Sequence, residues 1–126
     1  VQTLAQPAYA DWKRNLVVSA LRRARIDADV EPLIDAHGAV SAETAKAMAE
    51  GALKNSLADI AVSVTGVAGP GGGSLEKPVG LVHFACARRG GETVHVERRF
   101  GPLSRSEVRA RAVDQALDLL IDATAR

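Results

Sequence analysis

The pattern of apolar and polar positions predicts a helix over residues 41–57. Apolar side chains recur there every three or four positions, with charged residues on the opposite side, as in a helix that packs on one face. Ser41 has the residue type favoured at a helix N-cap, and Glu43 places negative charge in the first turn. The apolar stripe contains small side chains, so we expect this helix to lie close against a sheet; the stripe comprises Ala45, Met48, Ala49, Ala52 and Leu53.

Three apolar runs after this helix predict strands. Residues 59–66 and 79–87 are apolar at both odd and even positions, which is typical of strands buried on both faces. A third strand is predicted over residues 93–100. Because Gly90 and Gly91 separate the second and third runs, we expect these two strands to form an antiparallel hairpin.

Two further helices are predicted. A short helix is predicted over residues 31–36. Pro32 fits its first turn, where the missing N–H of proline costs nothing. The last helix spans residues 105–124, where Ser104 and Glu107 have the spacing of a capping box. The apolar positions of this helix that we expect to face the core are Val113, Ala116, Leu117, Leu120 and Ile121.

The start of the chain has a weaker pattern. Residues 12–25 are compatible with a helix, and residues 16–18 equally with the beginning of a short strand. Helices flanking a small sheet predict an α/β fold, a layered α/β/α sandwich whose small mixed sheet includes the antiparallel hairpin. Neither a repeat nor a linker divides the sequence, so we expect a single domain over residues 1–126.

Composition narrows the classes of function. The formal net charge is +1 and aromatic residues make up 3% of the 126 residues, which disfavours nucleic-acid binding. The chain has no apolar run of about 20 residues, the length that spans a bilayer, so we expect no membrane contact. A cytoplasmic location is the simplest interpretation.

The single cysteine and the three histidines favour structural roles. Cys86 excludes internal disulfides, and on a buried strand it is expected to be a small apolar side chain rather than a nucleophile. His83 and His95 lie on the two hairpin strands and are expected to face each other. His37 precedes a helix end. Because no cysteine or carboxylate cluster accompanies them, we expect no metal site.

The glycine-rich stretch between the first two strands is the strongest candidate for a ligand site. It begins where a buried strand ends, and glycines let backbone N–H groups approach an anion. A flexible connection between strands is an equally good interpretation on physical grounds. The stretch matches neither a Walker-type phosphate loop nor a dinucleotide fingerprint. The candidate ligand-binding residues here are Thr65, Gly66, Gly69, Gly71, Gly72, Gly73 and Lys77.

Several motifs in this order resemble one known family. Thr65-Gly-Val-Ala-Gly-Pro-Gly-Gly72 is followed by Lys77-Pro-Val-Gly80 and preceded by His37-Gly-Ala-Val-Ser41 and Met48-Ala-Glu-Gly-Ala52. The pattern of Arg105, Arg109, Ala116 and Leu117 completes the set. From about Leu33 onward the sequence is similar to the CinA C-terminal domain family, the nicotinamide-nucleotide amidases.

The resemblance implies hydrolysis of the carboxamide of nicotinamide mononucleotide, giving nicotinic acid mononucleotide and ammonia. It implies a serine nucleophile aided by Tyr and Lys groups, with no metal or other cofactor. The glycine-rich stretch and Arg105 or Arg109 are the groups expected to bind the phosphate of the nucleotide. Homo-oligomers are also expected.

The family's catalytic motifs are not found. Neither Glu-Ser-Cys-Thr-Gly-Gly nor Tyr-Ser-Asn-x-x-Lys occurs in this chain, and residues 17–25 stand where the second is expected. We therefore expect about the first 30 residues to be divergent or truncated, and we assign no catalytic residue. The resulting hypothesis is an amidase fold with weak or absent activity; the alternative is a non-catalytic module that binds a nucleotide or phosphate or serves in assembly.

Overall fold

A computed structural model describes residues 30–125. The helix or short strand predicted within residues 12–25 lies outside the described residues. Six elements occur, close to the predicted bounds: α2 (Val30–His37), α3 (Ala42–Lys54), β1 (Ile60–Gly66), β2 (Leu81–Arg88), β3 (Val94–Arg99) and α4 (Arg105–Ala125).

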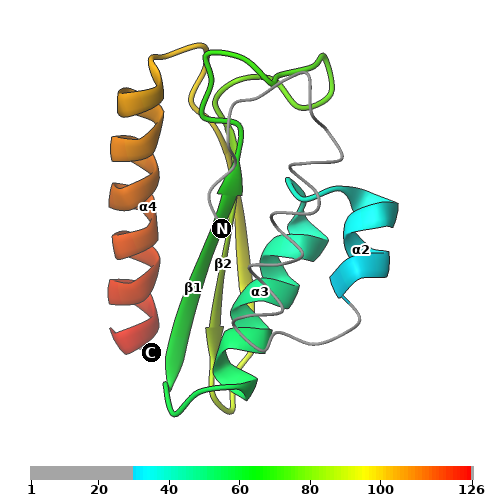
Figure 1. The fold of residues 1–126 in the computed structure, drawn as a ribbon. Coiled ribbons are helices and arrows are strands. Elements are labelled where there is room, and N and C mark those ends of the chain that lie inside the picture. Colours follow the sequence, from blue (N-terminus) through cyan, green and yellow to red (C-terminus); the bar gives the residue numbers. More distant parts are fainter. Residues whose placement is uncertain (1–29, 126) are drawn as a thin grey trace.

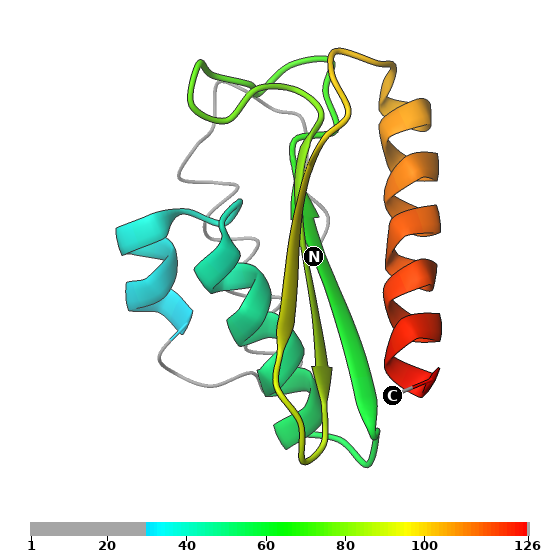
Figure 2. The ribbon, with the colours of Figure 1, turned by 180° about the vertical axis from the view of Figure 1, so that it is seen from behind.

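The elements form layers around a three-stranded sheet (Figures 1 and 2). Helix α4 covers one face of the sheet, α3 covers the other, and α2 packs against α3. This arrangement confirms the predicted layered α/β fold. The strand order is β1-β2-β3, and both pairings are antiparallel, so the described residues contain the predicted hairpin but no parallel pair.

Strand β2 is the centre of the core. Seven of its eight residues are buried, because the strand has a neighbour on each edge and a helix over each face. Its side chains alternate between the two faces. Phe84 and Cys86 join the cluster under α4, whereas Ala85 and Ala87 join the cluster under α3. Cys86 is 1% exposed, which confirms the prediction that it is a buried side chain.

Helix α3 packs through its small side chains, as predicted. Ala45 and Ala49 are fully buried against the alanines of β2, which brings the two backbones close together. Ser41 is the N-cap, and its side-chain oxygen accepts a hydrogen bond from the Thr44 backbone N–H. The buried Ser63 hydroxyl of β1 donates to the Ala45 carbonyl, which fixes α3 over the first strand.

The connection from α3 to β1 is closed by one arginine. The Arg89 guanidinium donates hydrogen bonds to the carbonyls of Leu53, Ser56 and Ala58, at 3.0, 3.3 and 2.6 Å. These carbonyls lie at and beyond the end of α3, where the helix cannot satisfy them itself. Arg89 therefore joins the end of α3 to the hairpin turn.

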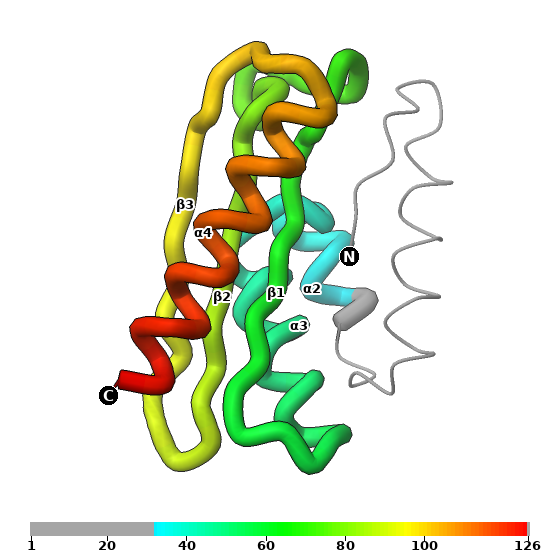
Figure 3. Tube along the Cα trace, turned by 90° about the vertical axis from the view of Figure 1, so that its left-hand side faces the viewer, coloured from blue at the N-terminus to red at the C-terminus, as the bar shows by residue number. Residues whose placement is uncertain are grey.

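Helix α4 is rotated relative to the sequence prediction. Ala116 and Leu120 pack against the core as expected. Val113, Leu117 and Ile121 were expected to face the core but are 57%, 51% and 63% exposed. The side chains that α4 buries completely are instead Val108, Leu119 and Ala123. The prediction therefore combined residues of two neighbouring rows, and the sheet contacts the row that includes Ala112 and Ala116. Figure 3 shows α4 lying over the strands of the sheet.

Two glycines hold the loops together at the end of the sheet near the start of α4. Gly80 has φ +91°, and its carbonyl accepts a hydrogen bond from the Phe100 N–H. A Cβ at Gly80 would overlap the Gly101 backbone, with the Gly101 nitrogen only 2.6 Å away. The loop before β2 and the turn after β3 therefore touch through bare backbone.

We predict that Gly80→Ala lowers the free energy of unfolding by about 2 kcal/mol more than Gly90→Ala does. Gly90 is the matched control because its φ is also positive, at +76°, but no atom lies within 4 Å of the added Cβ. The control should cost only the backbone strain of about 1–2 kcal/mol. Urea denaturation measures both values, and equal losses would contradict the proposed contact.

Candidate ligand-binding site

The glycine-rich loop, residues 67–80, connects β1 to β2 at the end of the sheet where α4 begins (Figures 1 and 2). It leaves β1 through a hydrogen bond from the Val67 N–H to the Leu81 carbonyl, at 2.9 Å. It returns through a bond from the Gly80 N–H to the Val67 carbonyl, at 2.8 Å. The two ends of the loop are thus held together at the edge of the core.

Two of the predicted ligand-binding side chains, Thr65 and Lys77, hold the loop and its surroundings in place. The Thr65 hydroxyl donates to the Ala39 carbonyl at 2.7 Å. The Lys77 ammonium donates to the His37 carbonyl at 2.8 Å. Thr65 and Lys77 therefore attach the loop and its preceding strand to the connection between α2 and α3. The Thr65 hydroxyl and the Lys77 ammonium thus each already donate a hydrogen bond within the protein.

Arg105 attaches the loop to α4. Its guanidinium donates a hydrogen bond to the Gly69 carbonyl at 3.1 Å, across 36 positions of sequence. The side chain is only partly exposed, so the arginine lies beside the loop as the sequence predicted. Arg109, one turn further along α4, is exposed, and no hydrogen bond or ion pair within residues 30–125 engages it.

Three of the glycines are required by packing of the protein against itself. A Cβ at Gly69 would lie 2.7 Å from a Val79 methyl group, and one at Gly73 would lie 2.9 Å from the Val79 nitrogen. A Cβ at Gly66 would lie 2.8 Å from the Leu81 carbonyl oxygen. The absence of side chains at these positions lets the two arms of the loop meet.

The middle of the loop has a different environment. Within the described part of the chain, no hydrogen bond engages the backbone N–H groups of Gly71, Gly72 and Gly73. Gly71 and Gly72 are half-buried and Gly73 is exposed, and Gly72 has φ +87°. Three successive amides at a glycine turn are the kind of feature that binds anions. The predicted glycines therefore have two roles. Gly66, Gly69 and Gly73 permit close packing, and Gly71, Gly72 and Gly73 have backbone N–H groups without a partner in the described residues.

The two hairpin histidines form a pair on the α3 face of the sheet. His83 Nδ1 and His95 Nε2 are 2.9 Å apart, and the rings are stacked with centroids 5.2 Å apart, which confirms that they face each other. Glu97 Oε1 lies 3.7 Å from His83 Nε2. Burial lowers the pKa of His83 most, opposed by the Glu97 carboxylate, while His95 and Lys77 lower it further.

Ser104 forms the predicted capping box at the start of α4: its hydroxyl donates to the Glu107 carboxylate at 2.9 Å and accepts from the Glu107 backbone N–H at 3.2 Å. Ser63 and Ser74 have no acid-base side chain as a hydrogen-bond partner. The Ser63 hydroxyl is taken by the Ala45 carbonyl, and the Ser74 oxygen accepts from the Lys77 backbone N–H. Across the same residues, no three His, Cys, Asp or Glu side chains are placed to share a metal ion. None of the helices α2, α3 and α4 has the length and apolar character to cross a membrane.

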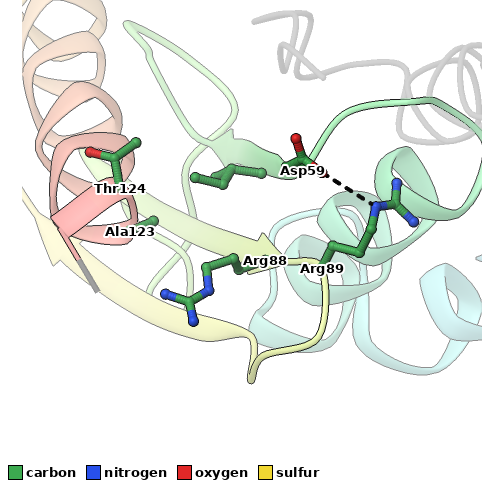
Figure 4. A pocket seen from close by; sticks show the side chains of 6 residues that line it. Asp59, Arg88, Arg89, Ala123 and Thr124 are labelled. Carbon is green, nitrogen blue, oxygen red and sulfur yellow. Dashed lines mark ion pairs between the residues drawn. The ribbon is translucent and has the colours of Figure 1, made fainter.

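A shallow depression at the opposite end of the sheet was not predicted (Figure 4). Its volume is about 450 Å³, and it opens between the start of β1, the end of β2 and the end of α4. Asp59 and Arg89 form an ion pair at its rim, with 3.8 Å between Oδ1 and Nε. Because Arg89 also closes the α3–β1 connection, its charge serves the fold there rather than a ligand.

The fold and the loop of residues 30–125 define a class: a layered α/β domain with a glycine-rich loop between two antiparallel strands of its sheet. A model of the CinA C-terminal domain family matches residues 19–124. The chain therefore belongs to the CinA C-terminal domain family.

Relatives and solved structures agree with this assignment. A CinA-like protein of Gloeobacter violaceus is 43% identical over 120 residues, 92% of this chain and 28% of the relative. One from Akkermansia muciniphila is 53% identical over 93 residues, 74% of this chain and 22% of the relative. The structure of a competence/damage inducible protein from Agrobacterium tumefaciens matches with TM-score 0.73 and 47% identity, covering 81% of this chain and 60% of that one. A competence damage-inducible protein from Klebsiella pneumoniae matches with TM-score 0.72 and 35% identity, covering 86% and 65%.

The matches cover only part of each relative. This chain spans only about a fifth to somewhat over a quarter of the curated relatives just described, and 60% of the Agrobacterium structure. The family and the fold are therefore established for this chain, whereas ligand and activity rest on the proposal below.

We predict that stability falls as the pH drops below about 6.5, and that His83→Gln removes part of this fall. The pKa of His83 is lower in the folded protein than in the unfolded chain, because burial disfavours the imidazolium. The unfolded chain therefore binds more protons between the two pKa values. This stabilisation is complete above the unfolded pKa and is lost as the pH falls towards the folded one.

Urea denaturation at several pH values between 5 and 8 measures this effect. The parent chain, measured at the same pH values, is the reference for His83→Gln. An unchanged pH dependence in His83→Gln would show that the buried histidine does not cause it.

Proposed function

We propose that this chain binds a pyridine mononucleotide through the phosphate, at the amides of Gly71, Gly72 and Gly73, and hydrolyses its carboxamide weakly or not at all. The observation that carries the proposal is the run of three backbone N–H groups without a hydrogen-bond partner in the described residues. The substrate class, nicotinamide mononucleotide, is what the sequence resemblance to the amidases of this family implies.

The surroundings of these amides suit an anionic ligand. The backbone dipoles of successive N–H groups point positive charge towards a bound phosphate. Arg105 holds the Gly69 carbonyl, which fixes the loop before the ligand arrives, and its guanidinium adds positive potential nearby. Arg109 is exposed one turn further on α4 and supplies a second positive charge near the same end of the sheet. A loop that is already ordered loses less conformational entropy on binding.

The chemistry of amide hydrolysis accounts for the second half of the proposal. Attack on a carboxamide needs an activated nucleophile and donors for the developing oxyanion. The loop amides are donors, but Ser63 and Ser74, which lie on β1 and in the loop, have no base as a hydrogen-bond partner. The Ser104 hydroxyl is engaged by Glu107 in the cap of α4. The family's Glu-Ser-Cys-Thr-Gly-Gly motif is absent from the sequence. The chain would therefore bind the nucleotide but lack the nucleophile that hydrolysis of the carboxamide needs.

Two further elements belong to the proposal. No cofactor or metal is needed to bind the phosphate or to position the amide. The single, buried Cys86 is compatible with a reducing compartment, so we place the protein in the cytoplasm. An assembly role is the second candidate function, favoured by the exposed apolar row of α4.

We predict that Gly71→Val weakens the binding of nicotinamide mononucleotide about tenfold or more, because the side chain covers the amides that receive the phosphate. Isothermal titration calorimetry measures the affinity. Gly91→Val is the matched control, since Gly91 lies in the β2–β3 turn at the other end of the sheet. Nicotinamide riboside, which lacks the phosphate, should bind weakly to the parent and to both variants. Equal affinities for the parent and Gly71→Val would remove the loop from the site.

We predict that the purified chain releases ammonia from nicotinamide mononucleotide no faster than a buffer blank. The reason is that the described serines near the loop have no activating group. A coupled ammonia assay under saturating nucleotide measures the rate. Gly71→Val, purified in the same way, controls for a contaminating amidase. Sustained release by the parent that is lost in Gly71→Val would overturn the prediction of weak activity.

A further inference from the structure

Helix α4 carries a second apolar row on the side that faces away from the sheet. The row consists of Val113, Leu117 and Ile121, which are 57%, 51% and 63% exposed. A spacing of four residues places them on one face, since the helix turns about 100° per residue. Ala110, one turn before Val113, is also exposed and extends the row towards the start of the helix.

This row differs from other exposed apolar side chains of the described residues. Leu57 and Leu75 are fully exposed as well, but each is a single side chain in a connection between elements. Isolated exposed apolar residues are normal on a protein surface, whereas contiguous rows mark interaction sites. The α4 row is therefore the surface to explain.

The charges of α4 indicate what covers the row. Apart from Glu107 of the N-terminal capping box, the first half of the helix carries Arg105, Arg109 and Arg111, and the second half carries Asp114, Asp118 and Asp122. This order opposes the helix macrodipole, which favours acidic residues early and basic residues late. An antiparallel copy of the same helix would bring the acidic half of each beside the basic half of the other.

We propose that a second copy of this chain packs on α4 in antiparallel fashion, about a two-fold axis near position 115. The sequence of the helix is self-complementary about this point. Val113 of one copy then packs beside Leu117 of the other, and Ala110 packs beside Ile121. Each such pair lies at the same height along the two helices to within about one residue, or 1.5 Å.

The same axis matches opposite charges beside the apolar row. Arg111 and Asp118 are seven residues apart and so lie on one side of the helix. In an antiparallel pair, Arg111 of each copy lies level with Asp118 of the other, giving two equivalent ion pairs. Both side chains are exposed, and no ion pair within residues 30–125 engages either. An isologous interface of this kind is the commonest form of homodimer.

The test measures self-association of the full chain by sedimentation equilibrium. The parent should dimerise, and Leu117→Lys should weaken dimerisation about tenfold or more, because a charge enters the centre of the apolar row. Leu75→Lys is the matched control, since Leu75 is a fully exposed leucine that belongs to the β1–β2 loop and not to α4. Circular dichroism checks that each variant keeps its helices.

Charge exchange tests the antiparallel arrangement. Arg111→Asp and Asp118→Arg should each weaken the dimer, and the double variant should restore it, because the ion pairs re-form with their signs exchanged. A monomeric parent, a dimer that Leu117→Lys leaves unchanged, or a double variant no better than the singles would overturn the proposal. The inference rests on α4 alone, so these outcomes leave the ligand-binding loop to its own test.

Discussion

The burial of β2 between two helices is the constraint on which the described structure depends. The strand is hydrogen bonded along both edges and covered on both faces, so β1, β3, α3 and α4 all contact it. Its two faces are unequal. Towards α3 it presents small alanines, which permit close approach, and towards α4 it presents larger side chains such as Phe84. The distance of each helix from the sheet follows from this difference in side-chain size.

The glycine-rich loop is positioned by the same core. The loop begins and ends where β1 and β2 leave the sheet, and three side chains from different elements hold it there: Thr65 from β1, Lys77 from the loop itself and Arg105 from α4. Each donates to a backbone carbonyl. Val67 of the loop also packs in a small buried cluster with Val40 and Leu81, so a segment rich in glycine becomes ordered. The arms of the loop are therefore ordered, while the backbone N–H groups of Gly71, Gly72 and Gly73 at its tip have no hydrogen-bond partner in the described residues.

Much of the fold was predictable because it depends on local patterns. The alanine stripe of α3, the Ser41 cap and the Gly90–Gly91 turn each act over a few residues, and each is confirmed. Strand alternation across that turn also sufficed to place His83 beside His95. Such features are set by the period of the element and by turn chemistry.

The features that sequence reasoning missed depend on distance or on competing surfaces. Arg105 acts on a carbonyl 36 positions away, so its role as a tether is not visible in the sequence. Helix α4 has two apolar rows, and the sequence prediction drew on both: Ala116 and Leu120 pack against the core as predicted, whereas Val113, Leu117 and Ile121 are exposed. The catalytic motifs of the family lie in a region that this chain does not reproduce, which is why no nucleophile was assigned.

Helix α4 links the two proposals while keeping them physically separate. Its first residue, Arg105, fixes the ligand loop, its inner row closes the core, and its outer row is the proposed dimer surface. With the two-fold axis near position 115, each Arg105 lies about ten residues, or roughly 15 Å, from the axis along the helix. The two helices run in opposite directions, so the two loops lie roughly 30 Å apart at opposite ends of the pair. Dimerisation would therefore neither complete nor block a loop, and the two loops would bind ligand independently.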